Sequence, residues 1–156
     1  MTFDDVLRFI YLFTSGVTAG ILIIVMTAVM PAILPLSDET TVRFKQRFDP
    51  LVDRINPAFV FIALVTGVLI LIFADDLSTT ATVATIVGVI GSAGVATTSM
   101  TVNMRINRRM AGWSTDSLPA EFGGLMQRWI KVHRIRTLCG VTAFVGYLIA
   151  VIAAID

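Results

Sequence analysis

The chain has very few of the side chains that bind metals or form covalent links. Its 156 residues include one cysteine, Cys139, and one histidine, His133. A single cysteine excludes an intrachain disulfide, and ordinary metal sites need three or four ligands from His, Cys, Asp and Glu. There is also no phosphate-binding glycine loop and no strand pattern, which speaks against a nucleotide-binding domain. We therefore expect no metal, no haem and no other cofactor, and the net charge of +1 gives no reason to expect nucleic acid as a partner.

Charged residues are scarce as well. They make up 15% of the chain, against about 25% in ordinary soluble domains. Four stretches contain no Asp, Glu, Lys, Arg or His, namely residues 9–36, 57–74, 77–102 and 137–155. Each is near or above the roughly 18 residues that a membrane-spanning helix requires, and none offers the polar face that a soluble helix needs. The sequence predicts an all-α fold, a transmembrane up-down four-helix bundle that forms a single membrane domain over residues 1–156.

The spans also lack the buried carboxylate that proton-coupled transporters usually carry, which argues against a small multidrug transporter. Eleven of the twelve Lys and Arg residues lie in two connections, residues 37–56 and 103–136. The positive-inside rule places both connections in the cytoplasm. We expect an integral multi-pass protein of the cytoplasmic (inner) membrane with both termini outside, and a first span that is retained rather than cleaved as a signal.

Prolines and glycines give further local predictions. Pro57 suits the first turn of a helix, so the second span is expected to begin there. The 37–56 connection before it has the spacing of an amphipathic helix, and Pro50 is expected to interrupt it. Acidic and basic residues balance in this connection, so we expect its charges to be solvated at the surface. The third and fourth helices are expected to extend past the membrane into the second connection. Gly16 and Gly20 have the GxxxG spacing, which serves either packing inside the monomer or a dimer face.

The second connection carries most of the distinctive side chains. Residues 103–136 hold the only histidine, both tryptophans and seven of the twelve basic residues. Asn103 and Asn107 are four residues apart, and Trp129, His133 and Arg136 also follow helical spacing, so each set shares a helix face. Because antiparallel neighbours bring their connected ends to one depth, we expect these five residues to converge on one cavity at the cytoplasmic surface.

These residue types permit a defined chemistry. His133 can act as a general base, and Arg136 can stabilise a substrate oxyanion. Asn103 and Asn107 can orient polar substrate atoms, while Trp113 and Trp129 can stack against an aromatic ring. The alternative reading is structural: tryptophans that anchor the interface, asparagines that bridge helices, and a histidine and an arginine that contact lipid phosphate.

A family resemblance rests on these same positions. The pattern N-x-x-x-N, a following tryptophan and then W-x-x-x-H-x-x-R-T resembles the anthrone oxygenase-like family of small four-helix membrane proteins, as does the M-P-A that ends the first helix. The residues concerned are Asn103, Asn107, Trp113, Trp129, His133, Arg136 and Thr137, with Met30, Pro31 and Ala32. The resemblance implies oxidation of anthrones to anthraquinones without a recognised metal or flavin.

Two functional hypotheses follow. In the first, the protein is a cofactor-free, membrane-embedded oxygenase of an anthrone-like or other polycyclic phenolic substrate. His133 takes a proton, Arg136 and the two asparagines hold the enolate oxygen, and the anion reacts with O2. In the second, it is a non-catalytic subunit or a lipid- or quinone-binding module of a larger membrane complex, or a homo-oligomer, whose glycine faces are contact surfaces.

Overall fold

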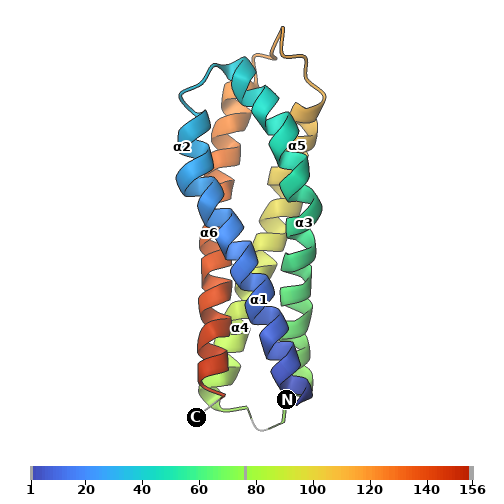
Figure 1. Ribbon diagram of the computed structural model, residues 1–156, viewed down its shortest axis with the longest axis vertical. Helices are drawn as coiled ribbons and strands as arrows, with labels where there is room; N and C mark the ends of the chain where they lie inside the picture. The colour runs from blue at the N-terminus through green and yellow to red at the C-terminus, as the bar shows by residue number, and fades with distance from the viewer. Residues whose placement is uncertain (1, 76, 155–156) are drawn as a thin grey trace.

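The structure is a computed structural model that describes residues 2–75 and 77–154. Every regular element in these residues is helical (Figure 1). The elements are α1 (Phe3–Ile24), η1 (Val25–Val29), α2 (Met30–Ile33), α3 (Asp38–Phe73), α4 (Thr79–Thr98), η2 (Ser99–Asn103), α5 (Met104–Ala111) and α6 (Phe122–Ile152), where η marks a π-helical turn.

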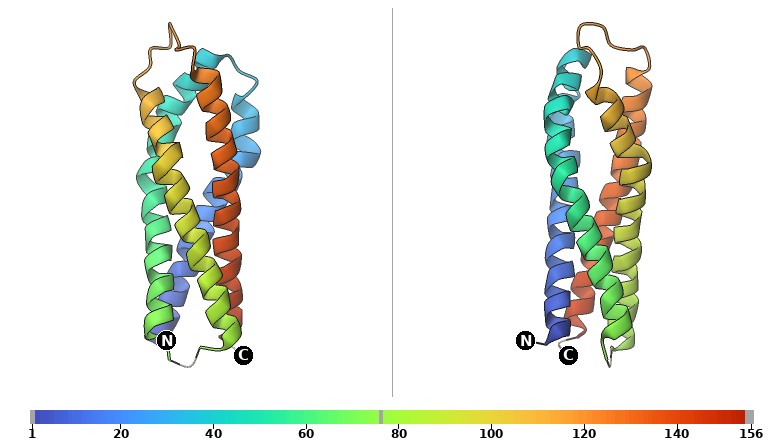
Figure 2. Two further views of the ribbon diagram at one scale, coloured as in Figure 1. Left: turned by 180° about the vertical axis from the view of Figure 1, so that it is seen from behind. Right: turned by 90° about the vertical axis from the view of Figure 1, so that its right-hand side faces the viewer.

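These elements join into four long antiparallel rods. The rods cover Phe3–Ile33, Asp38–Phe73, Thr79–Ala111 and Phe122–Ile152, and each is long and apolar enough to cross a membrane. Both termini lie at one end of the bundle beside the short 74–78 link, and the 34–37 turn and the 112–121 loop lie at the other (Figures 1 and 2). The predicted up-down four-helix bundle is confirmed. The predicted span 137–155 ends at Ile155, which lies outside the described residues.

The second rod differs from the sequence prediction. The helix does not begin at Pro57 and is not interrupted at Pro50, because α3 runs unbroken from Asp38 to Phe73 with both prolines inside it. Ser37 caps its first turn by accepting a hydrogen bond from Thr40 N at 3.3 Å. Both prolines lie on the exposed side of the helix, where the ring avoids neighbouring helices while the opposite face is held by packing. The 37–56 segment therefore continues the span as one rod.

The third and fourth helices continue into the second connection, as predicted. The third rod continues through η2 and α5 to Ala111, and α6 begins at Phe122, 15 residues before the charge-free stretch that starts at Thr137. The polar ends of three rods thus stand together at one end of the bundle.

Small residues bring α4 and α6 into backbone contact. A Cβ atom on Gly146 would lie 2.8 Å from Gly88 N, and one on Gly91 would lie 2.7 Å from Ala143 N. In lipid, such close approach provides the van der Waals contact that holds helices together. The two glycines of the GxxxG pair in α1 have different surroundings. Gly16 faces Phe144, whereas a Cβ atom on Gly20 would have no heavy atom within 4 Å.

Apolar clusters enclose a polar layer. One cluster closes the loop end of the bundle and includes Val42, Met110, Phe122 and Trp129. Another, nearer the middle, is built from Leu22, Val60 and Val95. His133 joins the two, since it stacks on Trp129 and contacts the carbonyl of Leu22.

Candidate functional site

Polar side chains from several elements are buried together in this layer. They come from α3, from η2 and α5, and from the first half of α6. Their members are Lys45, Asp49, Asn103, Asn107, Trp129, His133 and Arg136, and we refer to them as the polar cluster. Burying so many polar groups is costly unless each finds a partner, so their partners define what the site can do.

Trp129 is the centre of the polar cluster. Its Nε1 donates a hydrogen bond to Asn107 Oδ1 at 2.8 Å. One face of the indole stacks on His133, with ring centroids 4.8 Å apart and planes 4° from parallel. Lys45 Nζ lies 3.9 Å from the indole centroid, a distance at which a cation is attracted by the aromatic ring. These three contacts fix the ring inside the polar cluster.

His133 is completely buried, and its tautomer follows from its partner. Nε2 lies 3.3 Å from the carbonyl oxygen of Leu22, which can only accept, so Nε2 carries the hydrogen. Nδ1 then holds the lone pair, and it has no hydrogen-bond partner among the described residues. A proton on Nδ1 would be buried without an acceptor, so the ring is neutral.

An ion pair lies in the same layer. Lys45 Nζ is 2.8 Å from Asp49 Oδ2, and the two side chains are only 1% and 10% exposed. One turn further along α3, Asp53 Oδ2 accepts a hydrogen bond from Asn107 Nδ2 at 2.9 Å. Sequence reasoning treated the charges of this segment as a solvated surface and missed all three. The available signal was a Lys and an Asp four residues apart, which does not by itself distinguish burial from exposure.

Two members of the polar cluster have few partners. The Arg136 side chain is buried, its Nη1 donates to Ser99 Oγ at 3.4 Å, and its Nε has no partner in the described part of the chain. Arg136 forms no ion pair within residues 2–75 and 77–154, where the pairs found involve Arg8, Arg43, Lys45 and Arg109. Asn103 is fully buried, and neither of its amide atoms is hydrogen-bonded within those residues. Buried groups of this kind call for a ligand or water.

A cavity of about 360 Å³ opens beside Arg136. Its outer wall is apolar and comes from Pro57, Phe61 and Met100, among others. Its inner wall is polar and is formed by Asp53, Asn56, Ser99 and Arg136. The size falls in the range of small-molecule pockets, which combine apolar walls with a few polar groups. We call this the Arg136 cavity.

A second cavity of about 300 Å³ lies between α3 and α5. Its walls include the charged side chains of Lys45, Asp49 and Arg108. It shares Asp53 and Met104 with the Arg136 cavity, so Asp53 stands between the two. We call it the charged cavity. His133 is not among the residues that line either of them.

The sequence profile of a protein family described as anthrone oxygenase matches residues 48–146. This chain belongs to the anthrone oxygenase family. The resemblance inferred from the sequence is thereby confirmed, and the matched range contains every member of the polar cluster except Lys45. No curated protein and no solved structure was found to match the chain.

In this anthrone oxygenase family member, five of the six predicted site residues come together. Asn103, Asn107, Trp129, His133 and Arg136 all lie in the buried layer. The sixth, Trp113, lies apart in the loop end of the bundle, where it packs edge-on against Phe122 with centroids 6.3 Å apart. Its carbonyl oxygen accepts a hydrogen bond from Gln46 Nε2 at 2.9 Å. The catalytic and binding roles of all six stay predictions.

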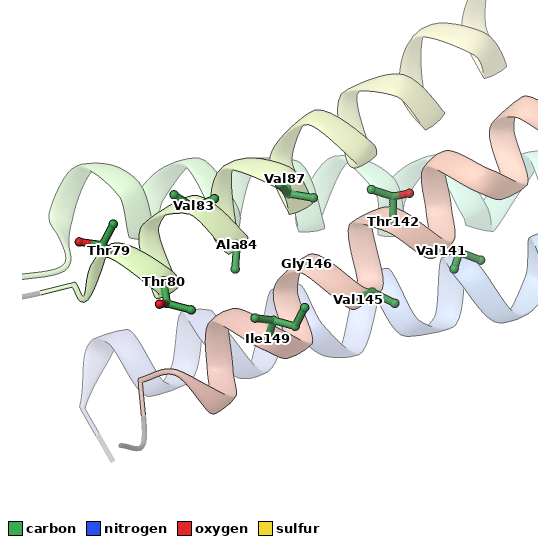
Figure 3. Close-up of a pocket in the computed structure, with 10 residues that line it drawn as sticks. All are labelled: Thr79, Thr80, Val83, Ala84, Val87, Val141, Thr142, Val145, Gly146 and Ile149. Carbon is green, nitrogen blue, oxygen red and sulfur yellow. The ribbon is translucent and has the colours of Figure 1, made fainter.

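A larger cavity of about 600 Å³ lies far from this layer, between α4 and the C-terminal half of α6 (Figure 3). Valine, isoleucine, alanine, glycine and threonine form its walls, and no ionisable side chain lines it. It offers no acid, base or charge to a reacting molecule. No group of three His, Cys, Asp or Glu side chains suited to a metal ion occurs among the residues that the structure describes.

Proposed function

We propose that this protein oxidises a polycyclic phenolic compound, such as an anthrone, with O2 inside the membrane, and that the substrate binds in the Arg136 cavity. The single observation that carries the proposal is a buried arginine that forms no ion pair within the described residues and lies beside a cavity whose other walls are mostly apolar. Membership of the anthrone oxygenase family supports the substrate class.

A buried cation is stabilised by a direct ionic partner, and Asp53, the carboxylate that shares the cavity, is not within ion-pair distance of Arg136. An enolate or phenolate oxygen supplies that partner, because its negative charge can face the guanidinium while its rings lie against Pro57, Phe61 and Met100. Arg136 then stabilises the anion formed during the reaction more than the neutral substrate. Preferential stabilisation of developing charge is the usual origin of a large rate enhancement.

The reaction balances with O2 as the only co-reactant. An anthrone has a CH2 group between two aromatic rings, opposite a ketone. Loss of one CH2 proton gives an enolate, whose carbon forms a bond to one oxygen atom of O2 and yields a hydroperoxide once a proton is added. Loss of the second hydrogen from that carbon breaks the O–O bond and leaves a new ketone and one molecule of water. The substrate is oxidised, O2 is reduced, and the chain needs to supply only proton transfer and charge stabilisation.

The base for this reaction was predicted to be His133. A neutral imidazole with an unpartnered Nδ1 supports that role. Its position does not, because the ring lies beyond the walls of the Arg136 cavity. A base must come within hydrogen-bonding reach of the proton that it removes, and the carboxylate that lines this cavity belongs to Asp53.

The membrane orientation is part of the proposal. Both basic connections lie at the same end of the bundle (Figure 1), and the positive-inside rule places that end in the cytoplasm, with both termini outside the inner membrane. The apolar wall of the Arg136 cavity would then receive a lipid-soluble substrate from the bilayer.

The non-catalytic alternative has less support. A subunit that binds through glycine faces should display those faces, whereas Gly91 and Gly146 are occupied by contacts between α4 and α6. In the GxxxG pair of α1, Gly20 faces open space but Gly16 is covered by Phe144. Cavities beside unpartnered polar atoms favour a small-molecule site.

The function is tested with purified protein in lipid nanodiscs. An anthrone is added, and O2 consumption and quinone absorbance are followed together. We expect Arg136→Ala to lower the rate about 100- to 1,000-fold, as loss of an oxyanion-stabilising group does. Arg136→Lys should restore it only in part, because an ammonium lacks the planar guanidinium fork.

Arg134→Ala is the matched control, since Arg134 lies on the same helix and is exposed. Its rate should equal that of the unchanged protein. Equal rates for Arg136→Ala and Arg134→Ala would show that the buried guanidinium takes no part in the reaction.

A further inference from the structure

We propose that Asp53, rather than His133, is the catalytic base that removes the proton from the substrate carbon, and that it passes the proton on to the charged cavity. This inference rests on the proposed function, because it assigns a role within the same site. Asp53 belongs to the segment that the sequence suggested was a solvated connection.

Asp53 lies between the two cavities. It lines both the Arg136 cavity and the charged cavity, and its side chain is half-buried. A substrate whose oxygen faces Arg136 therefore shares its cavity with the Asp53 carboxylate. The same carboxylate borders a cavity whose charged walls favour water, so a proton taken up on one side can leave on the other.

Hydrogen bonds fix the orientation of the Asp53 carboxylate. Asp53 Oδ2 accepts from Asn107 Nδ2, and Asn107 Oδ1 accepts from Trp129 Nε1. Both ends of the Asn107 amide are thereby fixed. A carboxylate has about four lone-pair positions, so one hydrogen bond holds it in place while leaving it able to take a proton.

His133 takes no part in the hydrogen bonds that link Asp53, Asn107 and Trp129. Its Nε2 is committed to Leu22, and its ring face is covered by Trp129. Neither His133 nor Trp129 lines the Arg136 cavity, whereas Asp53 does. Proximity to the reacting carbon therefore favours Asp53.

The first proton transfer runs from the substrate carbon to Asp53. The C–H bond of the substrate breaks, the proton goes to a carboxylate oxygen of Asp53, and the electron pair stays on the substrate and spreads onto the oxygen that faces Arg136. Asp53 releases the proton to water in the charged cavity. After O2 has bonded to the substrate carbon, Asp53 can take the second proton from that carbon.

Hydrogen exchange without O2 isolates this step. The anthrone is incubated anaerobically with the protein in nanodiscs in D2O, and deuterium incorporation at its CH2 group is measured above the rate in empty nanodiscs. Asp53→Asn is the main variant, since it keeps the size of the side chain and an acceptor for Asn107 while removing the basic oxygen. We expect exchange to fall at least about 100-fold, the lower end of the usual contribution of a general base.

Three comparisons accompany it. Asp53→Glu keeps a carboxylate and should retain more exchange than Asp53→Asn. His133→Gln keeps a donor for Leu22 and should lower exchange less than tenfold. Asp38→Asn removes an exposed carboxylate at the start of α3 and should leave exchange unchanged. Binding of the quinone product, followed by quenching of tryptophan fluorescence, shows that each variant is folded and binds.

The outcomes separate the two proposals. Normal exchange in an Asp53→Asn variant that still binds quinone overturns the assignment, as does a larger loss in His133→Gln than in Asp53→Asn. The absence of any exchange above background in the unchanged protein also overturns it. Exchange that requires Asp53, without O2 consumption on admission of air, would support the base and refute the oxygenase function.

Discussion

The buried ion pair of Lys45 and Asp49 gives the most quantitative prediction. The two charged atoms are 2.8 Å apart, and the side chains are 1% and 10% exposed. Removing one partner leaves the other charge buried without compensation, which costs about 3–5 kcal/mol. We expect Lys45→Met and Asp49→Asn each to lower the free energy of unfolding by about that amount. Lys45→Met also removes the cation from the Trp129 ring, worth about 0.5–2 kcal/mol.

The double variant is the decisive measurement. With both charges removed no buried ion remains, so its loss of stability should be smaller than the sum of the two single losses, with a coupling energy of about 2 kcal/mol or more. Unfolding is followed by the fluorescence of the two tryptophans during denaturant titration in mixed micelles. Additive losses would refute the reasoning, since additivity indicates sites that do not interact.

The chain contains a matched control for this cycle. Arg109 Nη2 and Glu121 Oε2 are also close, at 2.7 Å, but their side chains are 58% and 39% exposed. Exposed pairs usually contribute about 0–1 kcal/mol. Arg109→Met should therefore have little effect, and a loss as large as that of Lys45→Met would show that burial does not decide the energy of these pairs.

Two further predictions concern packing and topology. Gly146→Leu should separate α4 from α6, because a Cβ atom at Gly146 already lies 2.8 Å from a backbone atom of α4. Gly20→Leu places its side chain in open space. The midpoint temperature of thermal unfolding should therefore fall sharply for Gly146→Leu and stay unchanged for Gly20→Leu. In a variant without Cys139, Thr115→Cys should react with a membrane-impermeant maleimide in permeabilised cells but not in intact cells. Labelling in intact cells would show that the loop lies outside and would contradict the proposed orientation.

Part of the site could be read from the sequence because helical spacing records which residues share a face. Trp129, His133 and Arg136 follow such spacing, and in the structure they share the buried side of α6. Asn103 and Asn107 likewise face inward, because the π-helical turn η2 ends at Asn103 and the residues from there to Asn107 keep α-helical spacing. The clustering of rare residue types at one end of an apolar bundle made the location of the site predictable.

The role of the first connection could not be read in this way. Lys45, Asp49 and Asp53 have the composition of a solvated surface, and Pro50 and Pro57 are local signals for interruption. The fold overrides both signals, because the end of the third rod and the start of α6 cover this face of α3 and supply Asn107 and Trp129 as partners. Helix propensity is a weak prior that tertiary packing can outweigh.

The sequence by itself therefore determined the four spans, the gathering of basic residues at one end and the family. Each of these depends on composition or on spacing within a single segment, which the chain carries without reference to its neighbours. Only the tertiary structure decided that Trp113 lies outside the polar cluster, that His133 turns Nε2 toward Leu22, and that Asp53 borders two cavities and shares one of them with Arg136. These features depend on which segment covers a given face, and residues far apart along the chain meet only when the rods pack.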